Sequence, residues 1–177
     1  LPEETNRRIV DIISDVNMAY SEHARRYLAD CGLPKERTYV TGSPMAEVLH
    51  NNLAEIEASD IHQRLGLEKG KYILLSAHRE ENIDTEKNFM SLFSAINKMA
   101  EKYDMPILYS CHPRSRNRLA TSGFKLDKRV ILHDPLGFHD YNCLQMNAFA
   151  VVSDSGTLPE ESSFFTSVGH PFPAICI

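Results

Sequence analysis

The sequence has few cysteines, no long apolar run and no excess of positive charge, and each absence excludes a class of protein. Cys31, Cys111, Cys143 and Cys176 are scattered without a CxxC pair, so we expect neither a zinc site nor a disulfide framework. We interpret them as buried thiols of a protein in the reducing cytoplasm. The longest apolar runs are too short to span a bilayer. A formal net charge of −5 argues against a general nucleic-acid or membrane surface.

The segment Ser153–Ser162, with the sequence SDSGTLPEES, is the most informative part of the chain. It follows an apolar run that predicts a buried strand, and its Asp-Ser-Gly predicts a turn. A helix is expected to open around Thr157, so backbone N–H groups near Gly156 are placed to bind an anion such as phosphate. Glu161, about one turn into this helix, has the wrong charge for phosphate but suits sugar hydroxyls. Together these features suggest a nucleotide or nucleotide-sugar site.

A purely structural interpretation of the same segment is also open. Ser155 or Thr157 would then cap the helix, and Glu160 and Glu161 would complement the positive end of its dipole. The segment taken alone does not separate the two interpretations.

Strands and helices alternate after Gly70, which predicts an α/β fold with a Rossmann-like parallel sheet covered by helices on both faces. We expect strands at residues 72–76, 107–110, 130–133, 148–153 and 174–177, and helices at residues 88–103, 114–122, 140–147 and 159–167. The first part of the chain predicts helices at residues 4–14 and 22–31, strands at residues 16–20 and 37–41, and a helix starting near Pro44. Ser21 is the expected N-cap of the helix at residues 22–31.

Polar clusters follow three of these strands, at the edge where ligands bind in parallel sheets. They begin at His78, His112 and Asp154. A structural reading is open for each: His78 as a core histidine, His112 as a turn cap before Pro113, and Tyr141 as a core residue. Neither histidine cluster has the spacing of a zinc site, so no metal is expected.

Six motifs resemble the non-hydrolysing UDP-N-acetylglucosamine 2-epimerase family. They are PEETNRR at residues 2–8, TGSP at 41–44, SAHREEN at 76–82, CHPR at 111–114, DPLGFHDY at 134–141 and SDSGTLPEES at 153–162. The resemblance implies the glycosyltransferase-B architecture, in which two Rossmann-like halves enclose the substrate, present here only in part. Residues 1–54 would end the first half, residues 55–70 would form a junction, and residues 71–177 would form most of the UDP-binding half. The chain is expected to be an internal fragment that lacks an N-terminal basic segment with a catalytic aspartate, and a C-terminal Thr-Glu-Arg-Pro-Glu segment.

The resemblance also implies roles for individual residues. Glu3 and His78 would be catalytic, with His78 near the diphosphate. The residues implied to bind the UDP moiety are Ser155 and Gly156 for phosphate, Glu161 for the ribose hydroxyls, Tyr141 for uracil, and also Thr157 and Arg79. Arg79 and His112 match positions that hold a second, regulatory UDP-GlcNAc in some members.

The implied reaction interconverts UDP-GlcNAc and UDP-ManNAc by elimination and re-addition of UDP, for bacterial surface polysaccharide synthesis. The implied reaction needs no cofactor. The implied full-length protein is a homodimer, and the molecule that it binds is a UDP-sugar. The motifs SAHREEN and LGFHDYN also resemble those of enzymes that form UDP-N-acetyl-L-fucosamine from UDP-2-acetamido-2,6-dideoxy-L-talose. This resemblance suggests a second candidate substrate. A glycosyltransferase of the same architecture and a non-catalytic UDP-binding fragment also stay open, and the fragment alone is expected to be inactive.

Overall fold

The computed structural model describes residues 2–77, 85–111 and 113–177. The chain forms two compact units, Leu1–Pro44 and Met45–Ile177. Within the described ranges, every helix is too short or too polar to cross a membrane.

The first unit is small and is built around one pair of parallel strands. Its elements are α1 (Pro2–Ile13), β1 (Asn17–Ala19), α2 (Glu22–Asp30), the 3-10 helix η1 (Lys35–Arg37) and β2 (Thr38–Val40). Strand β1 pairs with β2 over three residues each, from Asn17 opposite Thr38 to Ala19 opposite Val40. The Ser21 hydroxyl accepts a hydrogen bond from the Ala24 N–H at 3.2 Å, which confirms Ser21 as the N-cap of α2.

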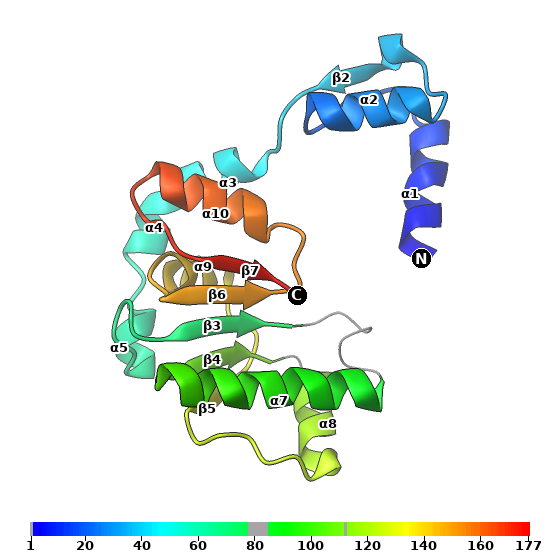
Figure 1. Cartoon of the computed structure of the whole chain (residues 1–177). Coiled ribbons are helices and arrows are strands. Elements are labelled where there is room, and N and C mark those ends of the chain that lie inside the picture. The colour runs from blue at the N-terminus through cyan, green and yellow to red at the C-terminus, as the bar shows by residue number, and fades with distance from the viewer. Residues whose placement is uncertain (1, 78–84, 112) are drawn as a thin grey trace. The chain divides into compact units, whose positions relative to one another are not determined.

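The second unit is a five-stranded, fully parallel sheet with helices on both faces (Figure 1). Its strands are β3 (Ile73–Ser76), β4 (Ile107–Ser110), β5 (Val130–His133), β6 (Ala150–Ser153) and β7 (Ala174–Cys176). Its helices are α3 (Met45–Asn51), α4 (Leu53–Glu57), α5 (Ile61–Leu65), α7 (Glu86–Tyr103), α8 (Pro113–Ser122), α9 (Phe138–Met146) and α10 (Leu158–Ser167). The predicted α/β class with a parallel sheet is confirmed.

The strand order is β5-β4-β3-β6-β7, so β3, the strand that comes first in the chain, lies at the centre of the sheet. The chain builds outward from β3 through β4 to β5, then returns to the other side of β3 for β6 and β7. The strands β3 and β6 therefore lie side by side at a topological switch point, with Ser76 opposite Ser153. Ligands of such sheets bind beyond the carboxyl ends of the strands at this point.

The sheet is buried on both faces because alternate strand residues point to opposite sides. Leu74 and Val151 face a core formed with α3, α4, α5, α9 and α10. Leu75 and Val152 face a second core that contains residues of α7 and α8. Helix α10 thus covers one face of the sheet, and its first turn lies at the end of β6.

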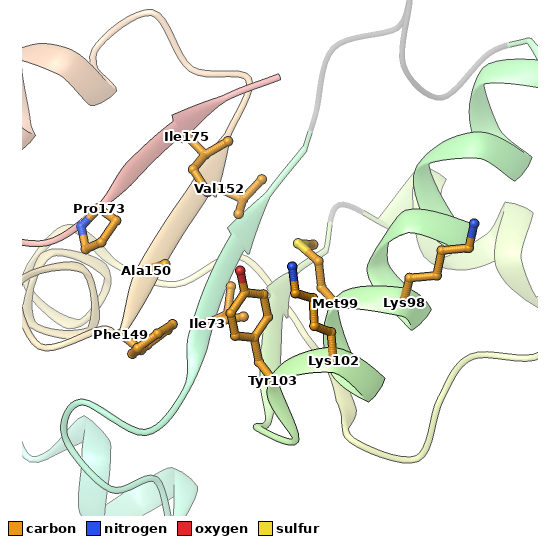
Figure 2. A pocket seen from close by; sticks show the side chains of 10 residues that line it. All are labelled: Ile73, Lys98, Met99, Lys102, Tyr103, Phe149, Ala150, Val152, Pro173 and Ile175. Carbon is orange, nitrogen blue, oxygen red and sulfur yellow. The ribbon is translucent and has the colours of Figure 1, made fainter.

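A groove opens on the α7 side of β6 and β7, and Figure 2 shows its lining. Its volume is about 380 Å³, and its floor is mainly apolar, with Phe149, Val152 and Ile175. Among its described lining residues, Lys98 and Lys102 carry charge. Because Val152 faces the core opposite to the one that contains α10, this groove is separate from the turn that follows β6.

The compact unit starts at Met45, and residues of the stretch 55–70 pack into its core, with Ile56, Ile61 and Leu67 buried. The short helix α4 was not predicted, since only two of its five residues, Leu53 and Ile56, are large and apolar. How the two units correspond to the domains of a longer protein stays a prediction.

The cysteines also differ in part from the expectation. All four are free thiols, and Cys111 and Cys143 are buried as predicted. The prediction of buried thiols is wrong for Cys31 and Cys176, which are exposed. Cys31 caps the end of α2, and Cys176 lies on the edge strand β7, so neither position is enclosed on all sides.

Candidate functional site

The turn after β6 is fixed to the neighbouring strand at the switch point. The Asp154 N–H donates to the Ser76 carbonyl at 3.2 Å, directly after the last residue pair of β3 and β6. Ser153 and Asp154 are buried, whereas Ser155 and Gly156 are exposed. The turn therefore has a rigid base in the sheet and an open tip.

Most backbone donors of this turn are already used inside it. The Ser155 N–H donates to Ser153 Oγ at 3.0 Å, the Thr157 N–H to Ser155 Oγ at 3.3 Å, and the Leu158 N–H to the Ser155 carbonyl at 3.4 Å. Among the hydrogen bonds of the described residues, none uses the N–H of Gly156. Gly156 is therefore the backbone donor of this turn that is available to an anion.

Neither conformation nor packing requires a glycine at position 156. Its φ angle lies outside the left-handed region, and a Cβ added there would meet no atom within 4 Å. The missing side chain instead leaves space above the free N–H at the start of α10. That space and the dipole of α10 favour a bound anion at this position.

A chain of hydroxyl groups connects the turn to the carboxylate of Glu161. Thr157 Oγ1 lies 2.8 Å from Glu161 Oε1, and Ser155 Oγ lies 2.9 Å from Thr157 Oγ1. An ionised carboxylate only accepts hydrogen bonds, so Thr157 must donate to Glu161 and Ser155 must donate to Thr157. The Ser155 hydroxyl can thus donate to a phosphate only if it leaves Thr157.

The second oxygen of Glu161 is held by α9. The Gln145 side-chain amide donates from Nε2 to Glu161 Oε2 at 2.7 Å. Both donors to this half-buried carboxylate are neutral, and Glu161 forms no ion pair with another residue that the structure describes. The carboxylate therefore keeps its charge available to hydroxyl donors at the protein surface.

Tyr141 borders the same site from α9. Its side chain is half-buried and packs against the core that α9 and α10 share. Burial raises the pKa of Tyr141 to about 12, although a hydrogen bond with Ser76 acts in the opposite direction. The structural reading of Tyr141 as a residue packed on the core therefore agrees with its position, and the predicted contact with a uracil base stays a prediction.

The structure brings together only some of the predicted site residues. Ser155, Gly156, Thr157 and Glu161 lie in one turn and the helix start that follows it. His78, Arg79 and His112 lie outside the described residues. In the described part of the chain, no group of His, Cys, Asp and Glu is arranged to hold a metal ion.

Glu3 lies in the other compact unit, in the first turn of α1. Its carboxylate pairs with Arg7 at 2.6 Å, and 72% of its side-chain surface is exposed. These features fit a residue that complements the helix dipole, and they equally leave the carboxylate accessible to a substrate. The catalytic role of Glu3 stays a prediction.

Sequence reasoning missed Gln145. It lies within a run of five buried residues of α9, 142–146, and its side chain has no exposed surface. A fully buried glutamine in such a run is unusual, because amides are costly to bury without partners. The burial of this amide, which periodicity alone does not give, is the signal that marks Gln145 as a residue with a specific polar partner.

Comparison with known proteins places this geometry in a family. A family model described as UDP-N-acetylglucosamine 2-epimerase matches residues 1–169. The structure of UDP-N-acetylglucosamine 2-epimerase from Rickettsia bellii is 38% identical with a TM-score of 0.85, and the match covers 98% of this chain and 45% of that one. The UDP-GlcNAc 2-epimerase of Methanocaldococcus jannaschii in complex with UDP-GlcNAc and UDP is 28% identical with a TM-score of 0.86, over 99% and 49%.

A curated UDP-N-acetylglucosamine 2-epimerase from Methanocaldococcus jannaschii is 29% identical over 169 residues, which cover 92% of this chain and 46% of the relative. The chain spans about half the length of the curated relatives it matches. The resemblance inferred from the six motifs is confirmed by these matches. The chain belongs to the UDP-N-acetylglucosamine 2-epimerase family.

Proposed function

We propose that this chain binds the UDP moiety of UDP-N-acetylglucosamine and forms the nucleotide-binding side of a 2-epimerase that interconverts UDP-GlcNAc and UDP-ManNAc. The observation that carries the proposal is the arrangement around Glu161. Its carboxylate is held by two neutral donors close to the free N–H of Gly156, in a chain of this family. A diol acceptor beside an anion site matches the ribose and the diphosphate of one nucleotide.

The chemistry of the substrate explains why such a site is needed. The C2 proton of an N-acetylhexosamine is not next to a carbonyl group, so its direct removal is difficult. Cleavage of the C1–O bond to UDP builds positive charge at C1 and makes the C2 proton more acidic. A base removes this proton as UDP leaves with the C1–O electron pair, which gives a glycal with a C1–C2 double bond; UDP adds again to C1 after a proton has been returned to the opposite face of C2. The protein must therefore hold the departing UDP and place a base and an acid near C2.

Gly156 and the first turn of α10 are suited to the first of these tasks. The Gly156 N–H and the helix dipole stabilise the negative charge that the diphosphate gains when the C1–O bond breaks. Glu161 keeps the ribose in place while the sugar reacts. Glu3 and His78 are proposed to act on the sugar and near the diphosphate, as the family resemblance implies.

The binding proposal is tested with Glu161→Ala and two nucleotides. Calorimetric titration of the wild-type protein is expected to give weaker binding for 2′-deoxy-UDP than for UDP. Glu161→Ala is expected to lose about 1.5–3 kcal/mol of UDP binding, because hydrogen bonds to a charged acceptor are lost. That loss corresponds to a roughly 10- to 150-fold increase in Kd.

Glu160→Ala is the matched control, since it removes the same charge from the same helix turn. Its UDP affinity should stay close to that of the wild type. Equal wild-type affinity for UDP and 2′-deoxy-UDP would rule out the ribose role of Glu161. An equal loss in both variants would instead point to a general effect of charge.

Glu3→Gln in the whole protein tests the catalytic proposal. Glutamine keeps the size and hydrogen bonding of Glu3 but cannot transfer a proton. A catalytic role predicts unchanged melting and UDP affinity, with turnover reduced by about 10² or more. A role limited to the helix dipole predicts a loss of only about 0.3–1 kcal/mol of stability and near-normal turnover. Normal turnover would remove Glu3 from the proposed mechanism.

The sugar, the location and the assembly are proposed from the resemblance. UDP-GlcNAc is the first candidate substrate and UDP-2-acetamido-2,6-dideoxy-L-talose the second. Deuterium exchange at C2 in D₂O, followed by NMR for each sugar with the whole protein, distinguishes them. The four free cysteines are compatible with the reducing cytoplasm. A homodimer of the whole protein stays a prediction.

A further inference from the structure

We propose that Gln145 is a positioning residue: it holds the Glu161 carboxylate in the orientation that accepts hydrogen bonds from the ribose hydroxyls. The inference rests on the proposed binding of UDP. It adds a residue from a different helix to the site, and neither a motif nor the family resemblance pointed to that residue.

The two bonds to Glu161 leave a defined acceptor pattern. Thr157 donates to Oε1 at 2.8 Å and Gln145 to Oε2 at 2.7 Å, so each carboxylate oxygen has one protein donor. A carboxylate offers about four acceptor positions, two on each oxygen. One position on each oxygen therefore remains, and this pair matches two neighbouring hydroxyl groups such as those of a ribose.

The orientation of the Gln145 amide follows from its partner. Because the carboxylate only accepts hydrogen bonds, the amide nitrogen must face Glu161. The amide oxygen Oε1 then points elsewhere, and it is buried without a hydrogen-bond partner among the described residues. An unpaired buried acceptor destabilises the fold.

The position therefore carries a glutamine at a cost to stability. The residues on either side, Leu144 and Met146, are apolar and buried in the core that α9 shares with α10. A methionine at position 145 would fill a similar volume without an unpaired amide oxygen. The bond that the glutamine makes, and that methionine lacks, is the one to Glu161. The geometry thus relates Gln145 to the carboxylate and not to the core.

Gln145→Met tests the inference through the ratio of Kd for 2′-deoxy-UDP to Kd for UDP. A freed carboxylate would no longer be fixed toward the hydroxyls, so the ratio should fall by about tenfold, toward that of Glu161→Ala. Gln63→Met is the matched control, since Gln63 is exposed in α5 and should keep the wild-type ratio. A folded Gln145→Met with the wild-type ratio overturns the inference.

A double-mutant cycle separates positioning from a general effect on the fold. If Gln145 acts through Glu161, then Gln145→Met should change UDP affinity less than about twofold in the Glu161→Ala background. An equal effect in both backgrounds overturns the inference. Gln145→Leu is measured in parallel, so that a variant that melts cooperatively decides the test even if Gln145→Met does not fold.

The same measurements distinguish a failure of this inference from a failure of the proposed function. If the wild type discriminates the two nucleotides and Glu161→Ala does not, the ribose site stands, and an unchanged ratio in Gln145→Met overturns only the role of Gln145. If the wild type itself does not discriminate, both the ribose role of Glu161 and the positioning role of Gln145 fail.

Discussion

Helix α9 takes part in two polar networks through consecutive residues, and they differ in charge and in completeness. The closed network consists of His62, Tyr72 and the carbonyl of Leu144, with Cys143 beside them. The open network consists of Gln145, Glu161, Thr157 and Ser155. The same helix thus contributes to the core through Cys143 and Leu144 and to the proposed nucleotide site through Gln145.

The closed network is neutral, and its hydrogen bonds have one consistent direction. The Tyr72 hydroxyl donates to the Leu144 carbonyl at 2.5 Å, so its oxygen accepts from His62 Nε2, which lies 2.9 Å away. A neutral His62 then presents Nδ1 as an acceptor, and the Cys143 sulfur lies 3.8 Å from both this nitrogen and the Ser59 carbonyl. The Tyr72 hydroxyl, the Leu144 carbonyl and His62 Nε2 thus all have partners inside the protein.

The open network contains a charge, an unpaired buried oxygen on Gln145 and two exposed or half-exposed hydroxyl groups. Its groups are satisfied only in part by the protein itself. The difference fits a role of the closed network in stability and the proposed role of the open network in binding UDP. Predictions at the closed network test this distinction, and one at a surface ion pair outside both networks gives the scale; they run from the largest expected effect to the smallest.

Tyr72→Phe should have the largest effect on stability. It leaves the buried Leu144 carbonyl and the half-buried His62 N–H without their partner, which costs about 1–3 kcal/mol. The free energy of unfolding in urea measures this loss. Tyr103→Phe is the control, because 42% of the Tyr103 surface is exposed and its ring contacts persist in phenylalanine.

The same variant should leave the ratio of 2′-deoxy-UDP to UDP affinity unchanged, since Glu161 does not contact the closed network. A folded Tyr72→Phe that loses this ratio would show that the two networks are coupled through α9. The distinction between them would then be wrong.

A pH dependence of stability should come next in size and should depend on His62. Burial, and secondarily the nearby Lys69, lower the pKa of His62, so the unfolded chain binds the proton more strongly than the folded protein. The stability contribution is complete above the unfolded pKa of about 6.5 and is lost as the pH falls toward the folded pKa. The groups that contact the ring are Tyr72 and Cys143.

Unfolding free energies of the wild type and His62→Gln, measured between pH 7.5 and pH 5, test this dependence. The variant should lose less stability on acidification than the wild type. His50→Gln, at an exposed position of α3, should keep the wild-type profile. Identical profiles for the wild type and His62→Gln would exclude His62 as the source.

The smallest effect is expected outside the closed network, at the surface of the α5–α9 contact. Arg64 bonds to Asp140 at 2.6 Å, and Ser59 donates to the same carboxylate at 2.6 Å. Because the Arg64 side chain is 49% exposed, Arg64→Met should cost at most about 1 kcal/mol and less at high salt. Thermal melting at low and high salt measures it, with Arg26→Met in the exposed pair with Glu22 as the control. A larger, salt-independent loss would contradict a surface ion pair.

The Asp140 carboxylate should also make the stability contributed by this contact depend on pH in acid. Hydrogen bonds from Arg64 and Ser59 lower the pKa of Asp140. Its contribution to stability is therefore present above the unfolded pKa of about 3.9 and is lost as the pH falls through the folded pKa. In Arg64→Met, this acid-dependent loss should be smaller than in the wild type.

Local patterns in the sequence determined most of the elements and the place of the site. The strands at residues 107–110 and 130–133 have the predicted bounds, and α10 starts directly after Thr157 as expected. The turn motif and Glu161 are also evident from the sequence alone, because turn chemistry and helix starts depend on residues close together in the chain. The family membership followed from motifs of the same local kind.

Only the tertiary structure decided which distant residues meet. The position of β6 beside β3, the bond between Gln145 and Glu161, and the bond between Tyr72 and Leu144 join residues that are 16 or more positions apart. Periodicity reports which face of an element is apolar, but it does not report which buried polar group faces which partner. That choice is made when the helices pack on the sheet, because each buried donor and acceptor must then find its partner among the groups that packing brings close.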